Sequence, residues 1–93
     1  MVSKYYFKLY ISGHSPKNDI MINIVETVFT EKLKERFALD IIDVSENPEL
    51  ALHANVFTTP TLSKHSPPPP SMAIGNFSNK EELLIALDMC MAM

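Results

Sequence analysis

Few side chains in this sequence of 93 residues could act together as nucleophiles, acids, bases or metal ligands. The single cysteine, Cys90, cannot form an internal disulfide, and its apolar neighbours indicate a core or interface thiol. The three histidines, His14, His53 and His65, have no ligand spacing relative to one another or to Cys90. We therefore expect surface histidines and no metal site.

Two residue pairs resemble catalytic groups, and both have a simpler explanation. Ser15 directly follows His14, but adjacent residues rarely reach the geometry of a nucleophile and its base, and Ser15 suits the N-cap of a helix. Asp40 and Asp43 are expected on opposite faces of a strand, because side chains alternate along it. The chain also has only two glycines, too few for a phosphate-binding loop. We predict no catalytic residue, no cofactor and no enzyme activity.

Composition and charge exclude further classes of function. The net charge is −3 and basic residues are interleaved with acidic ones, whereas nucleic-acid binding usually requires a basic patch. Although 46% of the residues are hydrophobic, no apolar run approaches the roughly 20 residues of a membrane span. The first residues lead directly into a strand-like segment, so we expect no signal peptide. We expect a cytoplasmic protein with a single domain over residues 1–93.

Apolar periodicity predicts alternating strands and helices along the chain. Ser15 and Pro16 are typical of a helix start, and Ser78 with Glu81 fits a capping box for the last helix. Signals are strong in the first half and weaker from about Glu46. We expect strands over 5–11, 38–44, 58–63 and 72–74, and helices over 17–35, from 47 to about 55, and after residue 78.

This order, βαβαββα, predicts an α/β fold with a four-stranded mixed sheet covered by helices, which is the thioredoxin-like arrangement. In such folds a redox dithiol occupies the turn between the first strand and its helix. The corresponding residues 12–16 contain no cysteine. Thiol–disulfide exchange at this turn is therefore excluded.

Prolines mark two segments of the second half, and each segment has two interpretations. Pro60 either makes a rigid entry to a strand or forms a cis bond that shapes a binding surface, and we favour a cis bond after Thr59. The run from Pro67 to Pro70 is either a stiff hairpin loop or a polyproline ligand for another domain. A stiff loop is favoured, because no arginine or second aromatic residue flanks the run.

Several short motifs run in one register, without gaps, from about Tyr5 to Met89. The most specific are Thr59-Pro60-Thr61-Leu62 and, at the right separation, Pro67-Pro68-Pro69. On these motifs the sequence resembles the KaiB family of circadian clock proteins. The other matching segments are Lys8-Leu9-Tyr10 with Gly13 and Pro16, Ala38-Leu39 with Ile42-Asp43-Val44, Asn47-Pro48 with Leu50-Ala51, Ile74-Gly75 with Ser78-Asn79, and Leu84-Ile85 with Leu87-Asp88.

The resemblance implies a non-enzymatic regulatory module that binds the ring of a KaiC-type ATPase and modulates its cycle, in a clock-like or stress-adaptation role. It also implies a metamorphic chain, whose thioredoxin-like monomer alternates with a tetramer in which the C-terminal half is rearranged. On this basis the candidate partner-binding residues are Tyr5, Lys8, Asn55 and Lys64. The region implicated in fold switching comprises Pro60, Pro67, Pro68, Pro69, Ala86 and Asp88.

The sequence departs from the family pattern at four positions. Ala86 stands where the clock proteins often have glycine, and alanine favours a helix by about 1 kcal/mol. Ile20, Asn55 and Met72 stand where arginine or lysine is common, at positions that family members use against KaiC. A thioredoxin-like adaptor that engages a sensor histidine kinase is the alternative function, and a dimer or tetramer is compatible with both functions.

Overall fold

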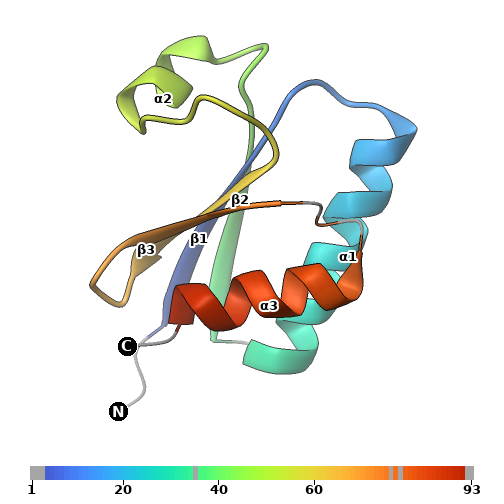
Figure 1. Ribbon diagram of the computed structural model, residues 1–93, viewed down its shortest axis with the longest axis vertical. Helices are drawn as coiled ribbons and strands as arrows, with labels where there is room; N and C mark the ends of the chain where they lie inside the picture. The colour runs from blue at the N-terminus through green and yellow to red at the C-terminus, as the bar shows by residue number, and fades with distance from the viewer. Residues whose placement is uncertain (1–3, 35, 76, 78, 92–93) are drawn as a thin grey trace.

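The computed structural model describes residues 4–34, 36–75, 77 and 79–91, and within them the chain forms four strands and three helices (Figure 1). None of the described helices is long and apolar enough to cross a membrane. The elements are β1 (Tyr5–Ile11), α1 (Pro16–Leu33), β2 (Phe37–Asp43), α2 (Pro48–His53), β3 (Thr61–Ser66), β4 (Ser71–Ile74) and α3 (Lys80–Met91). The predicted order of elements is confirmed.

The four strands form one mixed sheet in the order β2-β1-β3-β4. Helix α1 joins β1 to β2, which therefore run parallel, with Leu9 opposite Ile41. Strand β3 runs antiparallel to both β1 and β4, with Leu62 opposite Leu9 on one side and Ala73 on the other. The predicted four-stranded mixed sheet is thus confirmed, with β2 and β4 at its edges.

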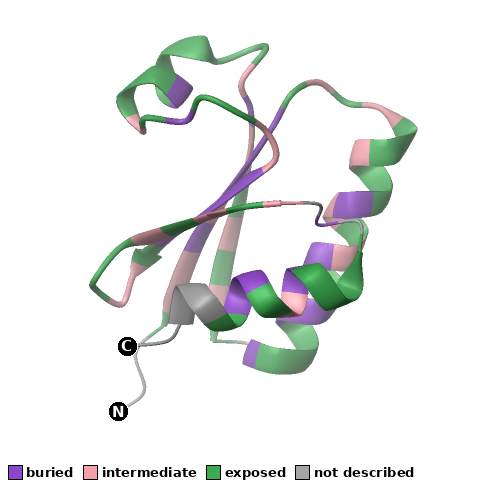
Figure 2. Cartoon of the chain, in the orientation of Figure 1, coloured by how far each residue is buried: buried purple, intermediate pink, exposed green. Residues whose placement is uncertain are grey.

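The hydrophobic core lies between one face of this sheet and the pair α1 and α3 (Figure 2). Alternate residues of β1 point into it, and Phe7, Leu9 and Ile11 have no exposed surface. The ring of Phe29, from α1, lies 4.7 Å from that of Phe7 and 5.5 Å from that of Phe37. These aromatic contacts join α1 to both parallel strands.

Helix α1 begins where its sequence signals predict. The side-chain oxygen of Ser15 accepts a hydrogen bond of 3.1 Å from the backbone N–H of Asn18, and Pro16 is the first helical residue. The helix ends at Leu33, two residues earlier than predicted, because Lys34 adopts a positive φ of 56°. The N-cap prediction is confirmed and the predicted end was wrong.

Helix α3 begins one residue later than the predicted capping box requires. The Oδ1 atom of Asn79 accepts hydrogen bonds from the backbone N–H groups of Glu81 (2.9 Å) and Glu82 (3.3 Å). The first helical backbone bond runs from Leu83 to the carbonyl of Asn79. The predicted N-cap, Ser78, lies outside the described residues, and Asn79 is the residue that caps the helix.

Replacing Asn79 with alanine is expected to lower the free energy of unfolding by about 1 kcal/mol, because two N–H groups of the first helical turn lose their acceptor. The Asn79→Asp variant keeps an acceptor at this position and should retain nearly all of the stability. Urea denaturation followed by circular dichroism measures both. Equal stability of Asn79→Ala and the unmodified chain would show that the cap lies elsewhere.

Strand β3 differs most from its prediction. It begins at Thr61 and continues to Ser66, whereas we expected a strand over 58–63 and a loop from Lys64. Pro60 precedes the strand, and Lys64 to Ser66 are held by pairing with neighbouring strands, in which Ser66 lies opposite Tyr6. The Thr59–Pro60 bond is cis, as predicted, and the Ser66–Pro67 and Pro68–Pro69 bonds are cis as well.

Candidate functional site

The second face of the sheet lacks the cover that α1 and α3 give to the first. Helix α2 lies away from these two helices, at the end of the sheet where β1 and β2 finish (Figure 1). There Ala51 and Val56 pack against Tyr10 and form a small second hydrophobic cluster. Helix α2 is thus anchored through one side and leaves its other side free.

A hollow of about 240 Å³ lies between α2 and this second face, and strands β1, β2 and β3 contribute to its floor. Its lining combines aliphatic, aromatic and basic side chains, which suits a polypeptide partner better than a small polar substrate. The lining residues are Lys8, Tyr10, Ile42, Leu50, His53, Ala54 and His65.

Exposed apolar side chains lie on α2 and in the segment that follows it, and one of them, Leu50, also lines the hollow. Leu50 is 48% exposed, Leu52 is 68% exposed and Phe57, in the turn after the helix, is 82% exposed. Most of the surface of α2 is green in Figure 2, which marks exposed residues. We call Leu50, Leu52, Phe57 and the hollow together the α2 surface. Several large exposed apolar side chains within one short segment are a feature of protein-binding surfaces.

Polar side chains continue the second face beyond the hollow. The hydroxyl of Tyr6 donates a hydrogen bond of 2.5 Å to Asp40, and this bond raises the pKa of Tyr6. The ring of Tyr6 lies 5.5 Å from that of His65, and the ammonium of Lys8 lies 5.9 Å from the centre of the Tyr6 ring. Desolvation of the His65 ring and, secondarily, the charge of Lys8 lower the pKa of His65. The second face beyond the hollow therefore carries polar side chains, and two of them, Tyr6 and His65, have shifted pKa values.

His65 is expected to titrate with a pKa below 6.5, the ordinary value for histidine. Because the unfolded chain then binds the proton more readily, the contribution of His65 to stability is complete above pH 6.5 and is lost as the pH falls through its lowered pKa. NMR titration of the imidazole signals measures the pKa. Lys8→Gln should raise it only partly, because desolvation is the larger cause. A His65 pKa at or above 6.5 would contradict this.

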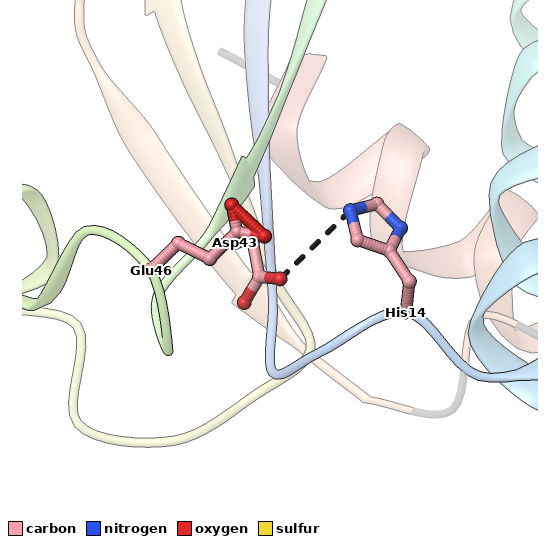
Figure 3. Close-up of side chains that lie close together, drawn as sticks. All are labelled: His14, Asp43 and Glu46. Carbon is pink, nitrogen blue, oxygen red and sulfur yellow. Dashed lines mark ion pairs between the residues drawn. The ribbon is translucent and has the colours of Figure 1, made fainter.

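A second polar cluster lies at the turn between β1 and α1. The carboxylate of Asp43 is only 7% exposed, and its Oδ1 atom accepts hydrogen bonds from Gly13 N (2.9 Å), Ser45 N (2.9 Å) and Ser45 Oγ (2.6 Å). The bond from the Ser45 hydroxyl, followed by that from Gly13, lowers the pKa of Asp43. His14 lies beside it, with Nε2 3.8 Å from Asp43 Oδ2 (Figure 3). Asp43 thus connects the ends of two neighbouring strands.

The cluster occupies the turn that we compared with the site of a redox dithiol. Residues 12–16 carry no thiol, and the hydroxyl of Ser15 accepts the capping bond of α1. The hydroxyl of Ser45 donates a hydrogen bond to the carboxylate of Asp43 and not to a histidine. Asp40 faces the other side of β2, as predicted, so the two aspartates do not form a carboxylate pair. The hydrogen bonds of the described residues in this turn thus fix the end of β2 and the start of α1.

Comparison with known proteins identifies the family. The family described as KaiB domain matches residues 8–89. The chain belongs to the KaiB family. Two of its relatives are the circadian clock oscillator proteins KaiB of Rippkaea orientalis and Thermosynechococcus vestitus. Each is 39% identical over 85 residues, or 91% of this chain, covering 82% and 79% of those proteins.

Solved structures confirm the thioredoxin-like fold of this KaiB-family chain. The N-terminal domain of Synechococcus elongatus SasA superposes with a TM-score of 0.76 at 16% identity, covering 98% of this chain and 86% of that one. The thioredoxin Deadhead of Drosophila melanogaster superposes with a TM-score of 0.70 at 16% identity, covering 94% and 81%. Similarity at this level of identity establishes the fold alone.

The four partner-binding candidates of this KaiB-family protein lie in different places in the structure. Lys8 lines the hollow, and Asn55 is exposed directly after α2 with a φ of 58°. Tyr5 stacks on Phe7 and packs against the core on the opposite face of the sheet. Lys64 is 2% exposed in the middle of β3. Only Lys8 and Asn55 therefore adjoin the α2 surface.

The residues implicated in fold switching occupy two regions. Pro67, Pro68 and Pro69 form the connection between β3 and β4, so the favoured interpretation of a hairpin connection agrees with the structure. Ala86 is 9% exposed and packs against the core from α3, whereas Asp88 is exposed on the same helix. Pro60 lies at the entrance to β3. These positions thus fall on three parts of the chain: the start of β3, the β3–β4 connection and α3.

Sequence reasoning missed the apolar residues of the α2 surface. The short helix was predicted, but nothing showed that Leu50 and Leu52 would face solvent while Ala51 is buried. Phe57 was the one available signal, because it is an aromatic residue between the predicted helix and the next predicted strand, where a large apolar side chain is rarely needed.

Proposed function

We propose that this chain is a non-enzymatic regulatory module, folded as a single cytoplasmic domain over residues 1–93, that binds a KaiC-type ATPase ring. Binding modulates the cycle of the ring in a clock-like or stress-adaptation role. The observation that carries the proposal is the KaiB domain match over residues 8–89, together with relatives named circadian clock oscillator proteins. The absence of a thiol from residues 12–16 supports a binding role rather than redox catalysis.

The α2 surface is the proposed contact with the ring. Phe57 and Leu52 are the most exposed apolar residues in this region, and we propose that their side chains become buried against the ring on binding. Lys8 lines the hollow and Asn55 follows α2, and both would supply polar contacts to the partner. Tyr5 and Lys64, on the other face or buried, are assigned no direct contact in this proposal.

The thioredoxin-like arrangement is proposed to be the binding-competent and dominant state. In it Ala86 is buried in α3, and alanine favours this helix over the glycine common in the clock proteins. The rearranged tetramer of the family is proposed as a minor resting form. Sedimentation of the free protein tests this. We expect a monomer, whereas a stable tetramer at micromolar concentration would contradict it.

The direct test is co-elution of the full chain with the KaiC-type ATPase of the same organism, with ATP or ADP present. We expect a complex in at least one nucleotide state. Absence of a complex in both states would contradict the proposal, and a complex with a sensor histidine kinase instead would favour the alternative adaptor function.

Replacing Phe57 with aspartate is expected to weaken binding to the ring by at least about 10-fold, because a charge replaces an apolar anchor. Ile85→Asp is the control, since Ile85 is 60% exposed but lies on α3. Biolayer interferometry compares the two variants. Equal weakening by both, or by neither, would show that the α2 surface is not the contact.

A further inference from the structure

Three potential metal ligands from distant parts of the sequence meet where β1 and β2 end (Figure 3). His14 belongs to the turn after β1, Asp43 is the last residue of β2, and Glu46 follows in the next turn. One ligand atom from each lies within 4.8 Å of the other two. Parallel neighbouring strands bring their carboxyl ends together, which explains why sequence spacing predicted no such group.

The carboxylate of Asp43 is positioned so that one oxygen is fixed and the other is available. Oδ1 accepts three hydrogen bonds, from Gly13 and Ser45, and these hold the side chain in place. Oδ2 accepts no hydrogen bond from any described residue, and it faces His14 Nε2 at 3.8 Å. That distance exceeds a hydrogen bond, but it approaches the spacing of about 3.4 Å between two ligands of a tetrahedral ion with bonds of about 2.1 Å.

The second nitrogen of His14 is also placed as in metal sites. Its Nδ1 atom lies 3.9 Å from Oδ1 of Asp19, in the first turn of α1. Metal-binding imidazoles commonly present the other ring nitrogen to a carboxylate, which orients the ring and increases its basicity. At 3.9 Å this contact is longer than a hydrogen bond, so the His14 ring would have to move toward Asp19 to form one. Asp19 also offsets the positive N-terminal end of α1, which would otherwise repel a cation.

We propose that His14, Asp43 and Glu46 bind a divalent transition-metal ion, of which zinc is the probe, through Nε2 and two carboxylate oxygens. One imidazole and two carboxylates match the donors of zinc sites, and the two carboxylates balance the charge of the ion. Three protein ligands leave a fourth position for water or for a group of a binding partner. The bound ion links the turn before α1 to the turn before α2, and this link stabilises the protein by mass action.

Zinc titration of the full chain, carrying Cys90→Ser to remove the thiol as a competing ligand, tests the site. We expect saturable binding at micromolar zinc by calorimetry, a melting temperature that rises with zinc concentration, and NMR shifts centred on residues 13, 14, 43 and 46. His14→Ala and Glu46→Gln should each weaken binding by at least about 10-fold. Both residues are exposed, so the variants should fold normally.

The control is His53→Ala, which removes an exposed histidine of α2 and should leave zinc affinity unchanged. Absence of saturable binding would overturn the proposal. Binding that survives His14→Ala, or that is lost with His53→Ala, would overturn it as well. None of these results depends on whether the protein binds an ATPase ring.

Discussion

Replacing Phe29 with alanine is expected to lower the free energy of unfolding by about 3–5 kcal/mol. Phe29 has no exposed surface, and its ring contacts Phe7 and Phe37, so its removal leaves a cavity between α1 and the two parallel strands. Domains of this size have a total stability of roughly 5–15 kcal/mol, so the variant should be close to unfolding. Urea denaturation followed by circular dichroism measures the loss.

The control for this prediction is Phe57→Ala, the same substitution at a side chain that is 82% exposed. It should change the free energy of unfolding by no more than about 0.5 kcal/mol. A comparable loss at both positions would mean that Phe57 packs against the protein in solution. A loss below about 1 kcal/mol at Phe29 would mean that α1 does not pack on the sheet as described.

Replacing Asp43 with alanine is expected to lower the free energy of unfolding by about 2–3 kcal/mol, the second largest effect. The change leaves the N–H groups of Gly13 and Ser45 without their acceptor at a site that is partly shielded from water. Both turns at the ends of β1 and β2 depend on these bonds. The measurement is denaturation in the presence of a chelator, so that no metal ion contributes to stability.

Asp40→Ala is the matched control on the same strand. Asp40 is exposed and accepts one hydrogen bond, from the hydroxyl of Tyr6, so its loss should cost no more than about 1 kcal/mol. If the two aspartate variants lost equal stability, the hydrogen bonds of Asp43 would not carry the role that we assign to them.

Sequence patterns predicted the order of elements because most of the local signals agree with the fold. The alternation of Phe7, Leu9 and Ile11 places one face of β1 in the core, and Ser15 with Pro16 marks the start of α1. The wrong predictions concern the ends of elements, where neighbouring residues are alternative strand ends or alternative helix caps. Lys64 belongs to β3 because two neighbouring strands pair with that segment, and Asn79 rather than Ser78 caps α3.

The functional surfaces were less predictable, because they depend on contacts between distant segments. Lys8 and Asn55 were named from family resemblance, but the exposure of Leu52 and Phe57 depends on how α2 rests on Tyr10. The buried environment of Asp43 likewise arises only when the turn after β1 folds over the end of β2. Periodicity along one segment contains no information about such encounters.

Hydrogen exchange of the chain, measured by mass spectrometry with and without the KaiC-type ATPase ring, tests the proposed binding surface most directly. We expect the ring to protect the segment 48–57, which carries the exposed residues Leu50, Leu52 and Phe57, and to leave the segment around Ile85 on α3 unchanged. Protection confined to α3, or no protection at saturating ring, would contradict the claim that this protein acts through its α2 surface.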